Sequence, residues 1–338
     1  MSGWKSMETK MSLLLFPLLF SLGKLSEKDF YRLLKTIVLI VAILPVIGFF
    51  NQWGLYQTQG DSGFLYNDNL VSIFNKQAVY YALYCNTALI FLIYLIEKRK
   101  VKTTFEKVIA VLVLFLLIAS MYLLASRTSM VIMVGILLSY LIWLVTQRLS
   151  KIQGVLFILG GLIMISAFVV SFPKVLNRFQ SITNVEYRFD NPNPINHFNG
   201  EIKEENWNGL NTRLALWTCA IEKIKEKPII GYGIGDVQAA LVDKYKEKNF
   251  ILALQSNYNT HNQFLDILMA SGLFGFIVVL VFFILLIRNC ISNKNWLFFG
   301  FLLLLIISGM TENILNRNQG VVFLALILSL LAFRTQKS

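Results

Sequence analysis

The chain has 338 residues, of which 56% are hydrophobic, and its mean hydropathy is +0.61. This composition is too apolar for a soluble globular domain and is typical of a membrane protein. The net charge of +12 could indicate a nucleic-acid partner, but the cations gather in short segments between apolar runs, which argues against nucleic acid.

Apolar segments recur along the chain, and their lengths approach the roughly 17–25 residues that cross a bilayer core. We predict eight membrane spans, at 33–50, 78–96, 108–125, 129–146, 152–172, 264–287, 296–310 and 320–333. Because backbone polar groups in lipid must be satisfied within each helix, we expect an all-α, polytopic transmembrane helical bundle, a single integral membrane domain over 1–338. A shorter run at 11–23 contains Pro17 and could be a kinked span, a re-entrant piece or the remnant of a longer N-terminal region.

The distribution of Lys and Arg predicts the topology. Fifteen of the 31 cations lie in the segments on one side of the predicted spans, five lie in the short segments on the other side, and eleven lie in 173–260. Cytoplasmic segments carry the excess of Lys and Arg, whereas long loops cross regardless of charge. We therefore expect a cytoplasmic C-terminus and one large external, periplasmic loop at 173–260.

The external loop is expected to contain amphipathic helices. Asn211 or Thr212 can cap a helix that continues to Lys227. Its apolar face would carry Leu214, Trp217, Ile221 and Ile224, so that the helix lies on the membrane surface or covers the bundle. The spacing of Gly231, Gly233 and Gly235 predicts a flexible turn before a second short helix at 236–247. No buried strand precedes these glycines, so they do not form a dinucleotide-binding loop.

His261 is the candidate general base. Thr260 and Gln263 have the spacing of a capping box, which would place His261 in the first turn of the next apolar helix. A helix N-terminus disfavours a positive imidazolium. A neutral imidazole can accept a proton, as a general base must. The alternative is an interfacial histidine that only forms hydrogen bonds.

Arginines are the candidate binding groups for an anionic substrate. Arg127 lies between two spans with almost no loop, and Arg213 lies at the start of the external helix. A guanidinium can hold phosphate oxygens in bidentate fashion. Alternatively, Arg127 snorkels to the membrane surface and Arg213 is a solvated loop residue. Weaker candidates are Arg178, Arg188, Glu312 and Arg317.

A metal site is not expected. His197 has no Cys or His neighbour with ligand spacing, and no Asp-x-Asp pair occurs on the external side. A diphosphate bound there would have to be neutralised by arginines.

Several of these residues together resemble the O-antigen ligase and O-antigen polymerase superfamily. The resemblance covers about 70–338 and is carried, in order along the chain, by Ser126-Arg127, Arg213 with Trp217, the run from Pro228 to Gly235, His261-Asn262 leading into Phe264, the run from Gly272 to Gly275, and Thr311-Glu312-Asn313. Members usually have further N-terminal spans, so three explanations stay open: the chain as given is N-terminally shortened, the protein is naturally short, or 11–23 does not cross the membrane.

The resemblance implies a metal-independent, cofactor-free inverting glycosyltransferase of the GT-C type in the bacterial inner membrane. Its donor would be a glycan on undecaprenyl pyrophosphate, and its acceptor a hydroxyl of lipid A-core, of another glycan or of a protein. Arg127 and Arg213 would hold the pyrophosphate and His261 would activate the acceptor. Trp217, Asn262 and Glu312 would support the site, with Arg178, Arg188 and Arg317 as further candidates.

The sequence leaves the kind of transfer open. Ligation, repeat-unit polymerisation and protein glycosylation share the same motifs. A polysaccharide transporter and a structural membrane subunit are the non-enzymatic alternatives. A transporter should place ionisable residues near the middle of the bilayer, whereas the polar residues here collect at one surface, which favours the enzyme.

Overall fold

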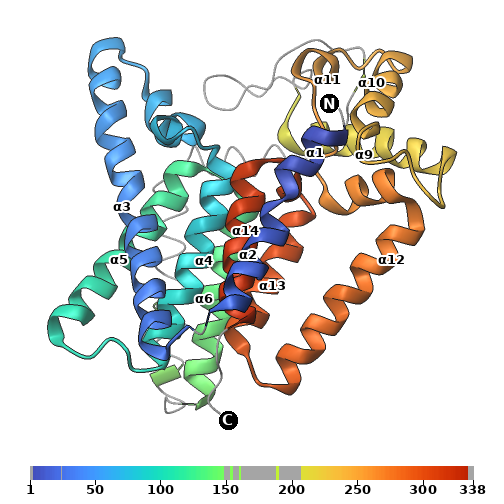
Figure 1. Ribbon diagram of the computed structural model, residues 1–338. Coiled ribbons are helices and arrows are strands. Elements are labelled where there is room, and N and C mark those ends of the chain that lie inside the picture. Colours follow the sequence, from blue (N-terminus) through green and yellow to red (C-terminus); the bar gives the residue numbers. More distant parts are fainter. Residues whose placement is uncertain are drawn as a thin grey trace. The chain divides into compact units, whose positions relative to one another are not determined.

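The computed structural model describes residues 3–23, 25–147, 153–154, 160, 188–189 and 207–333 (Figure 1). Within these ranges the secondary structure consists of α-helices and short 3₁₀ helices, without a strand. The expectation of an all-α polytopic bundle is confirmed. The chain divides into two compact units, a first unit of Met1–Phe30 with Asn184–Ser338 and a second unit of Tyr31–Thr183.

The second unit is built around α4. Its helices are α3 (Glu27–Gln59, most of which belongs here), η1 (Ser62–Leu65), η2 (Asn67–Phe74), α4 (Ala78–Glu97), α5 (Thr104–Leu124) and α6 (Arg127–Gln147). The α4 helix packs against both α5 and α6. The Asn86 side-chain amide of α4 donates to the backbone oxygen of Ser129 (2.9 Å), in the first turn of α6. This bond fixes the start of α6, where Arg127 lies, against α4.

The first unit contains the remaining helices of the described residues. They are α1 (Gly3–Lys10), α2 (Ser12–Leu22), α9 (Gly209–Glu226), α10 (Val237–Glu247), α11 (Ile251–Ser256), α12 (Gln263–Ser292), α13 (Trp296–Gly309), η3 (Ile314–Asn316) and α14 (Asn318–Ala332). The α2 helix packs along α14 (Figure 1). The α12 helix contacts both α13 and α9.

Five described helices are long and apolar enough to cross a membrane, namely α3, α4, α5, α6 and α12, and α13 and α14 are shorter apolar helices of 14 and 15 residues. Seven predicted spans coincide with these helices, whereas most of 152–172 lies outside the described residues. The predicted span 33–50 lies within the longer helix α3, which extends over Glu27–Gln59. The run at 11–23 forms the eleven-residue α2. A helix of that length is about 17 Å long, too short to cross a core of about 30 Å alone.

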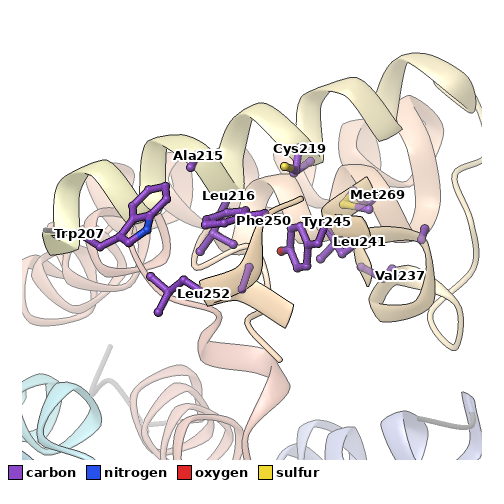
Figure 2. Packing of buried hydrophobic residues seen from close by; sticks show 13 residues of the cluster. Trp207, Ala215, Leu216, Cys219, Val237, Leu241, Tyr245, Phe250, Leu252 and Met269 are labelled. Atoms are coloured by element: carbon purple, nitrogen blue, oxygen red, sulfur yellow. The ribbon is translucent and has the colours of Figure 1, made fainter. Parts of the chain in front are cut away.

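A hydrophobic cluster joins α9, α10, α11 and the start of α12 (Figure 2). The α9 face that enters it carries Ala215, Leu216, Cys219 and Ala220. The predicted apolar face is borne out in part, since Trp217 and Ile224 pack against this cluster whereas Ile221 is 44% exposed. Three of these four residues, Ala215, Cys219 and Ala220, have small side chains, which allow neighbouring helices to approach closely.

The predicted start of the external helix was also wrong. Asn208 caps α9, because its side-chain oxygen accepts from the backbone N–H groups of Leu210 and Asn211 (both 2.9 Å). The second short helix is confirmed as α10.

The α12 helix bends sharply at Gly272, whose backbone angles (φ 62°, ψ −166°) lie outside the helical region. Such angles are essentially restricted to glycine. The segment 228–233 lies against the bend through four backbone hydrogen bonds, Tyr232 N to Met269 O (2.7 Å), Gly233 N to Ala270 O (2.9 Å), Leu273 N to Pro228 O (2.8 Å) and Phe274 N to Ile229 O (3.2 Å). We call residues 228–235 and 269–274 the elbow. The glycine-rich turn, predicted to be flexible, is thus held by backbone pairing.

Substitution of Gly272 should destabilise the elbow. A Cβ atom there would lie 2.2 Å from the backbone oxygen of Ile229. We expect Gly272→Ala to lower the free energy of unfolding by about 1–3 kcal/mol through backbone strain alone, and the clash adds to this loss. Thermal unfolding of the purified protein measures the effect. Gly135→Ala is the matched control, because no atom lies within 4 Å of its added Cβ. Equal unfolding temperatures for the two variants would contradict a rigid elbow.

Candidate active site

The loop before α12 places His261 just outside the helix. Asn262, not Thr260, is the N-cap, and its side-chain oxygen accepts from the N–H groups of Phe264 (3.0 Å) and Leu265 (3.1 Å). The predicted capping box was therefore wrong, and His261 precedes the cap instead of lying in the first turn. His261 has a positive φ of 44°. Such angles are uncommon outside glycine and persist where surrounding contacts hold them.

Those contacts come from the turn between α13 and α14. The Asn313 side-chain oxygen accepts from the backbone N–H of Asn262 (2.6 Å) and from the Thr260 hydroxyl (3.1 Å). The Asn313 amide donates to Asp266 Oδ1 (2.9 Å), and the Asn316 amide donates to the same oxygen (3.0 Å). The turn is thus fixed to the start of α12 by buried polar groups.

This attachment brings three charged or titratable side chains into a chain of contacts. His261 Nδ1 lies 3.1 Å from Glu312 Oε2, and an Arg213 terminal nitrogen donates to Glu312 Oε1 (2.8 Å). The Glu312 side chain is only 15% exposed, whereas those of Arg213 and His261 are 27% and 29% exposed. We call Arg213, Glu312 and His261 the triad. Glu312 bridges the other two members and is its least accessible group.

The environment of Glu312 favours its carboxylate form. Burial by itself raises the pKa of this carboxyl group, but the hydrogen bond and charge of His261, together with those of Arg213, outweigh burial and leave the pKa below its usual value of 4.5. Glu312 is therefore a carboxylate near neutral pH. It can accept a hydrogen bond from His261 when Nδ1 bears the proton.

The lowered pKa of Glu312 predicts a loss of stability in acid. The folded state favours the carboxylate more than the unfolded chain does, so this contribution to stability is complete above pH 4.5 and disappears as the pH falls through the lowered folded-state value. We expect the difference in unfolding temperature between the wild type and Glu312→Gln to shrink below pH 4.5. A difference that stays constant or grows in acid would contradict this charge assignment. Thermal unfolding from pH 3 to 7 tests it.

Arg213 is held by three bonds and keeps donor capacity. Its Nε donates to Thr311 O (3.2 Å) and one terminal nitrogen donates to Gly209 O (3.2 Å), in addition to the Glu312 contact. A guanidinium has five N–H groups, so two N–H groups are not engaged by the described residues. Arg213 can therefore position Glu312 and still donate to an anion.

The other predicted site residues lie in different surroundings. Trp217, one turn after Arg213, packs against the hydrophobic cluster, and its indole N–H is buried without an acceptor among the described residues. Arg317 and Arg188 are exposed, and Arg178 lies outside the described residues. Arg127 is the first residue of α6, in the second unit. Its action together with the triad stays a prediction.

Asp266 and Asn313 are two polar residues of the site that the sequence analysis did not predict. Asp266 is the only acidic residue of α12 and is only 7% exposed, and Asn313 is 1% exposed. A single carboxylate in an otherwise apolar helix indicates a functional or structural polar contact, and this signal could have been found. Among the residues that the structure describes, no group of three or more His, Cys, Asp or Glu side chains could hold a metal ion.

Comparison with known proteins identifies the family. The family model described as O-antigen ligase matches residues 112–280, half of the chain, and this match includes Arg127, Arg213 and His261. A search of curated proteins found no match. The apolar helices and the family together indicate a multi-pass membrane protein with a lipid-linked glycan and an acceptor as its general partners. The chain belongs to the O-antigen ligase family.

Proposed function

We propose that the protein transfers a glycan from undecaprenyl pyrophosphate to a hydroxyl acceptor, with His261 as the general base. The observation that carries the proposal is the contact of His261 Nδ1 with Glu312 Oε2 (3.1 Å). A carboxylate at Nδ1 favours the tautomer in which Nδ1 bears the proton. The Nε2 lone pair is then available to accept a proton from an acceptor hydroxyl.

The reaction would be a single displacement. The acceptor hydroxyl gives its proton to His261 Nε2, and its oxygen forms a bond to the anomeric carbon of the donor. The bond from that carbon to the pyrophosphate oxygen breaks, and its electron pair stays on the pyrophosphate. Attack opposite the leaving group inverts the configuration. Because pyrophosphate leaves as a stable anion, arginines can stabilise it and no metal or acid catalyst is required.

Arg213 and Arg127 are the proposed pyrophosphate-binding residues. Arg213 has two N–H groups to offer, and the contact with Glu312 holds its guanidinium in place. Arg127 begins α6, and the Asn86 bond to Ser129 fixes this helix start. A helix N-terminus favours anions, which adds to the charge of the guanidinium.

Lysine should not replace Arg127. An ammonium group keeps the charge but lacks the planar pair of donors, so a bidentate phosphate contact is lost. We expect Arg127→Lys to reach the membrane normally and to lose about tenfold or more in transfer rate, since one charge-assisted hydrogen bond contributes about 1.5–3 kcal/mol. Initial rates with a lipid-linked donor measure the loss. A wild-type rate would identify Arg127 as a snorkelling residue.

The intermediates that accumulate in a deletion strain test the proposal and its alternatives. Loss of a ligase should leave long glycans on the lipid carrier, and loss of a repeat-unit polymerase should leave single units. Loss of a protein O-oligosaccharyltransferase should leave an unmodified acceptor protein, and loss of a transporter should leave glycan on the cytoplasmic face. Wild-type protein should restore the glycan, whereas His261→Asn should not. Absence of any lipid-linked intermediate would contradict a role in glycan transfer.

The triad favours an enzyme over a transporter. His261 precedes α12 and Glu312 follows α13, so both lie at helix ends rather than in the middle of apolar helices. We further propose the bacterial inner membrane as the location, with the triad on the periplasmic side and the C-terminus in the cytoplasm. The excess of cations in the opposite segments supports this orientation.

A further inference from the structure

The elbow exposes a group of large apolar side chains that the triad does not use. Their exposed fractions are 69% for Ile229, 76% for Ile230, 48% for Ile234, 53% for Leu273 and 73% for Phe274. Hydrogen bonds from Leu273 to Pro228 and from Phe274 to Ile229 bring the two segments side by side. We call these five residues the elbow patch.

The exposure of the elbow patch is enforced by the backbone. Gly231 and Gly272 both have positive φ, and a Cβ atom on either would lie within 2.5 Å of a backbone oxygen of the other segment. The two backbones therefore approach each other closely at both glycines, which fixes the segments that carry the patch. Single exposed apolar residues are ordinary, but a contiguous apolar group on a rigid support indicates a binding surface.

The residues that follow the patch indicate its partner. Past the bend, α12 continues from Leu273 to Ser292 as 20 residues, about 30 Å of helix, which equals the thickness of a bilayer core. In an 18-residue apolar stretch of α12, only 6% of the residues are buried in the described part of the chain. The patch is continuous with this lipid-length helix surface, so lipid is the partner that fits both.

The lysines beside the elbow patch also fit a lipid partner. Lys225 and Lys227 are exposed at the end of α9, directly before the elbow. The Lys227 ammonium lies over the Tyr232 ring (4.7 Å to its centre), whereas the Lys223 ammonium, 5.4 Å from the same centre, is paired with Glu226. Cations and an aromatic ring beside apolar side chains are typical of the level of lipid phosphates at a membrane surface.

We propose that the elbow patch inserts into the membrane interface and anchors α9, α10 and α11 to the bilayer. The bilayer core would then begin at Gly272, not at the start of α12. The first segment of α12, nine residues from Gln263 to Ser271, is about 14 Å long and connects the anchored elbow to the triad. The elbow would therefore set the height of His261 above the hydrocarbon, and this last consequence rests on the proposed function.

The accessibility of a spin label tests whether the elbow patch lies in the membrane interface, without an activity measurement. The full chain with Ile230→Cys would be spin-labelled at the new cysteine and placed in nanodiscs of phosphatidylethanolamine and phosphatidylglycerol. Lys246→Cys, an exposed position on α10, is the water-facing control. The three native cysteines are buried, and the unsubstituted chain serves as the blank for their labelling. Collision rates with oxygen, which is enriched in lipid, and with a water-soluble nickel chelate would be measured at each site.

We expect the oxygen-to-nickel ratio at position 230 to exceed that at position 246 several-fold. Equal ratios at the two positions would place the patch in water and overturn the proposal. Low accessibility to both reagents at position 230 would also overturn it, because that result indicates a protein contact such as a second copy of the chain. Wild-type transfer by His261→Asn together with a high ratio at position 230 would overturn the general-base assignment and leave the anchor intact, so the two proposals can fail separately.

Discussion

Replacing His261 with alanine is expected to abolish glycan transfer while expression and donor binding stay nearly unchanged. Removal of a positioned general base typically costs about 10²–10⁴-fold in rate. The His261 side chain is 29% exposed, so its loss should not open a cavity in a packed core. Initial rates with purified protein and a lipid-linked donor, alongside a donor-binding measurement, separate the chemical step from binding.

Asparagine at position 261 is the decisive control. It retains a hydrogen-bonding side chain that can face Glu312 but cannot act as a base near neutral pH. We expect His261→Asn to be as inactive as His261→Ala. Transfer at the wild-type rate by His261→Asn would show that His261 only shapes the loop, and the general-base assignment would then be wrong.

Replacing Glu312 with glutamine is expected to lower kcat on the order of 10²-fold and to change KM little. The amide carries no charge to balance an imidazolium. It can also turn its NH₂ group toward Nδ1, which shifts the ring proton to Nε2 and removes the free lone pair. Steady-state kinetics measure the separate effects on kcat and KM.

Two further variants separate positioning from folding. Glu312→Asp keeps the carboxylate and should recover part of the lost rate, although its shorter side chain lengthens the contacts. Glu247→Gln makes the same change of a carboxylate to an amide in an ion pair outside the triad, with Lys244 of α10. It should leave the rate unchanged. A rate for Glu312→Gln equal to that of Glu247→Gln would remove Glu312 from the mechanism.

The sequence predicted the bounds of the apolar helices closely where hydrophobicity alone determines them. The spans 78–96 and 108–125 correspond to Ala78–Glu97 and Thr104–Leu124 in the structure. A continuous apolar run of bilayer length can satisfy its backbone polar groups only as a helix, so local composition is sufficient. The start of the second helix is set locally too, by a capping box between Thr103 and Glu106.

Local patterns failed where distant residues compete for the same polar groups. Thr260 and Gln263 have the spacing of a capping box, but each has a partner in the turn after α13. The Thr260 hydroxyl donates to Asn313, and the Gln263 side-chain oxygen accepts from the N–H of Leu315 (2.8 Å). With both side chains engaged, Asn262 takes the capping position and His261 is left outside the helix.

The sequence by itself determined the membrane class, the helical fold and the identity of His261, Arg213 and Glu312 as candidate residues. Only the tertiary structure decided that these three form one chain of contacts with Glu312 at its centre. Glu312 is 51 residues from His261 and 99 from Arg213 along the chain. Contacts at such separations depend on how helices and turns pack, which neither composition nor periodicity encodes. The turn from Thr311 to Asn316 brings them together because the side-chain amides of Asn313 and Asn316 form hydrogen bonds with the polar start of α12.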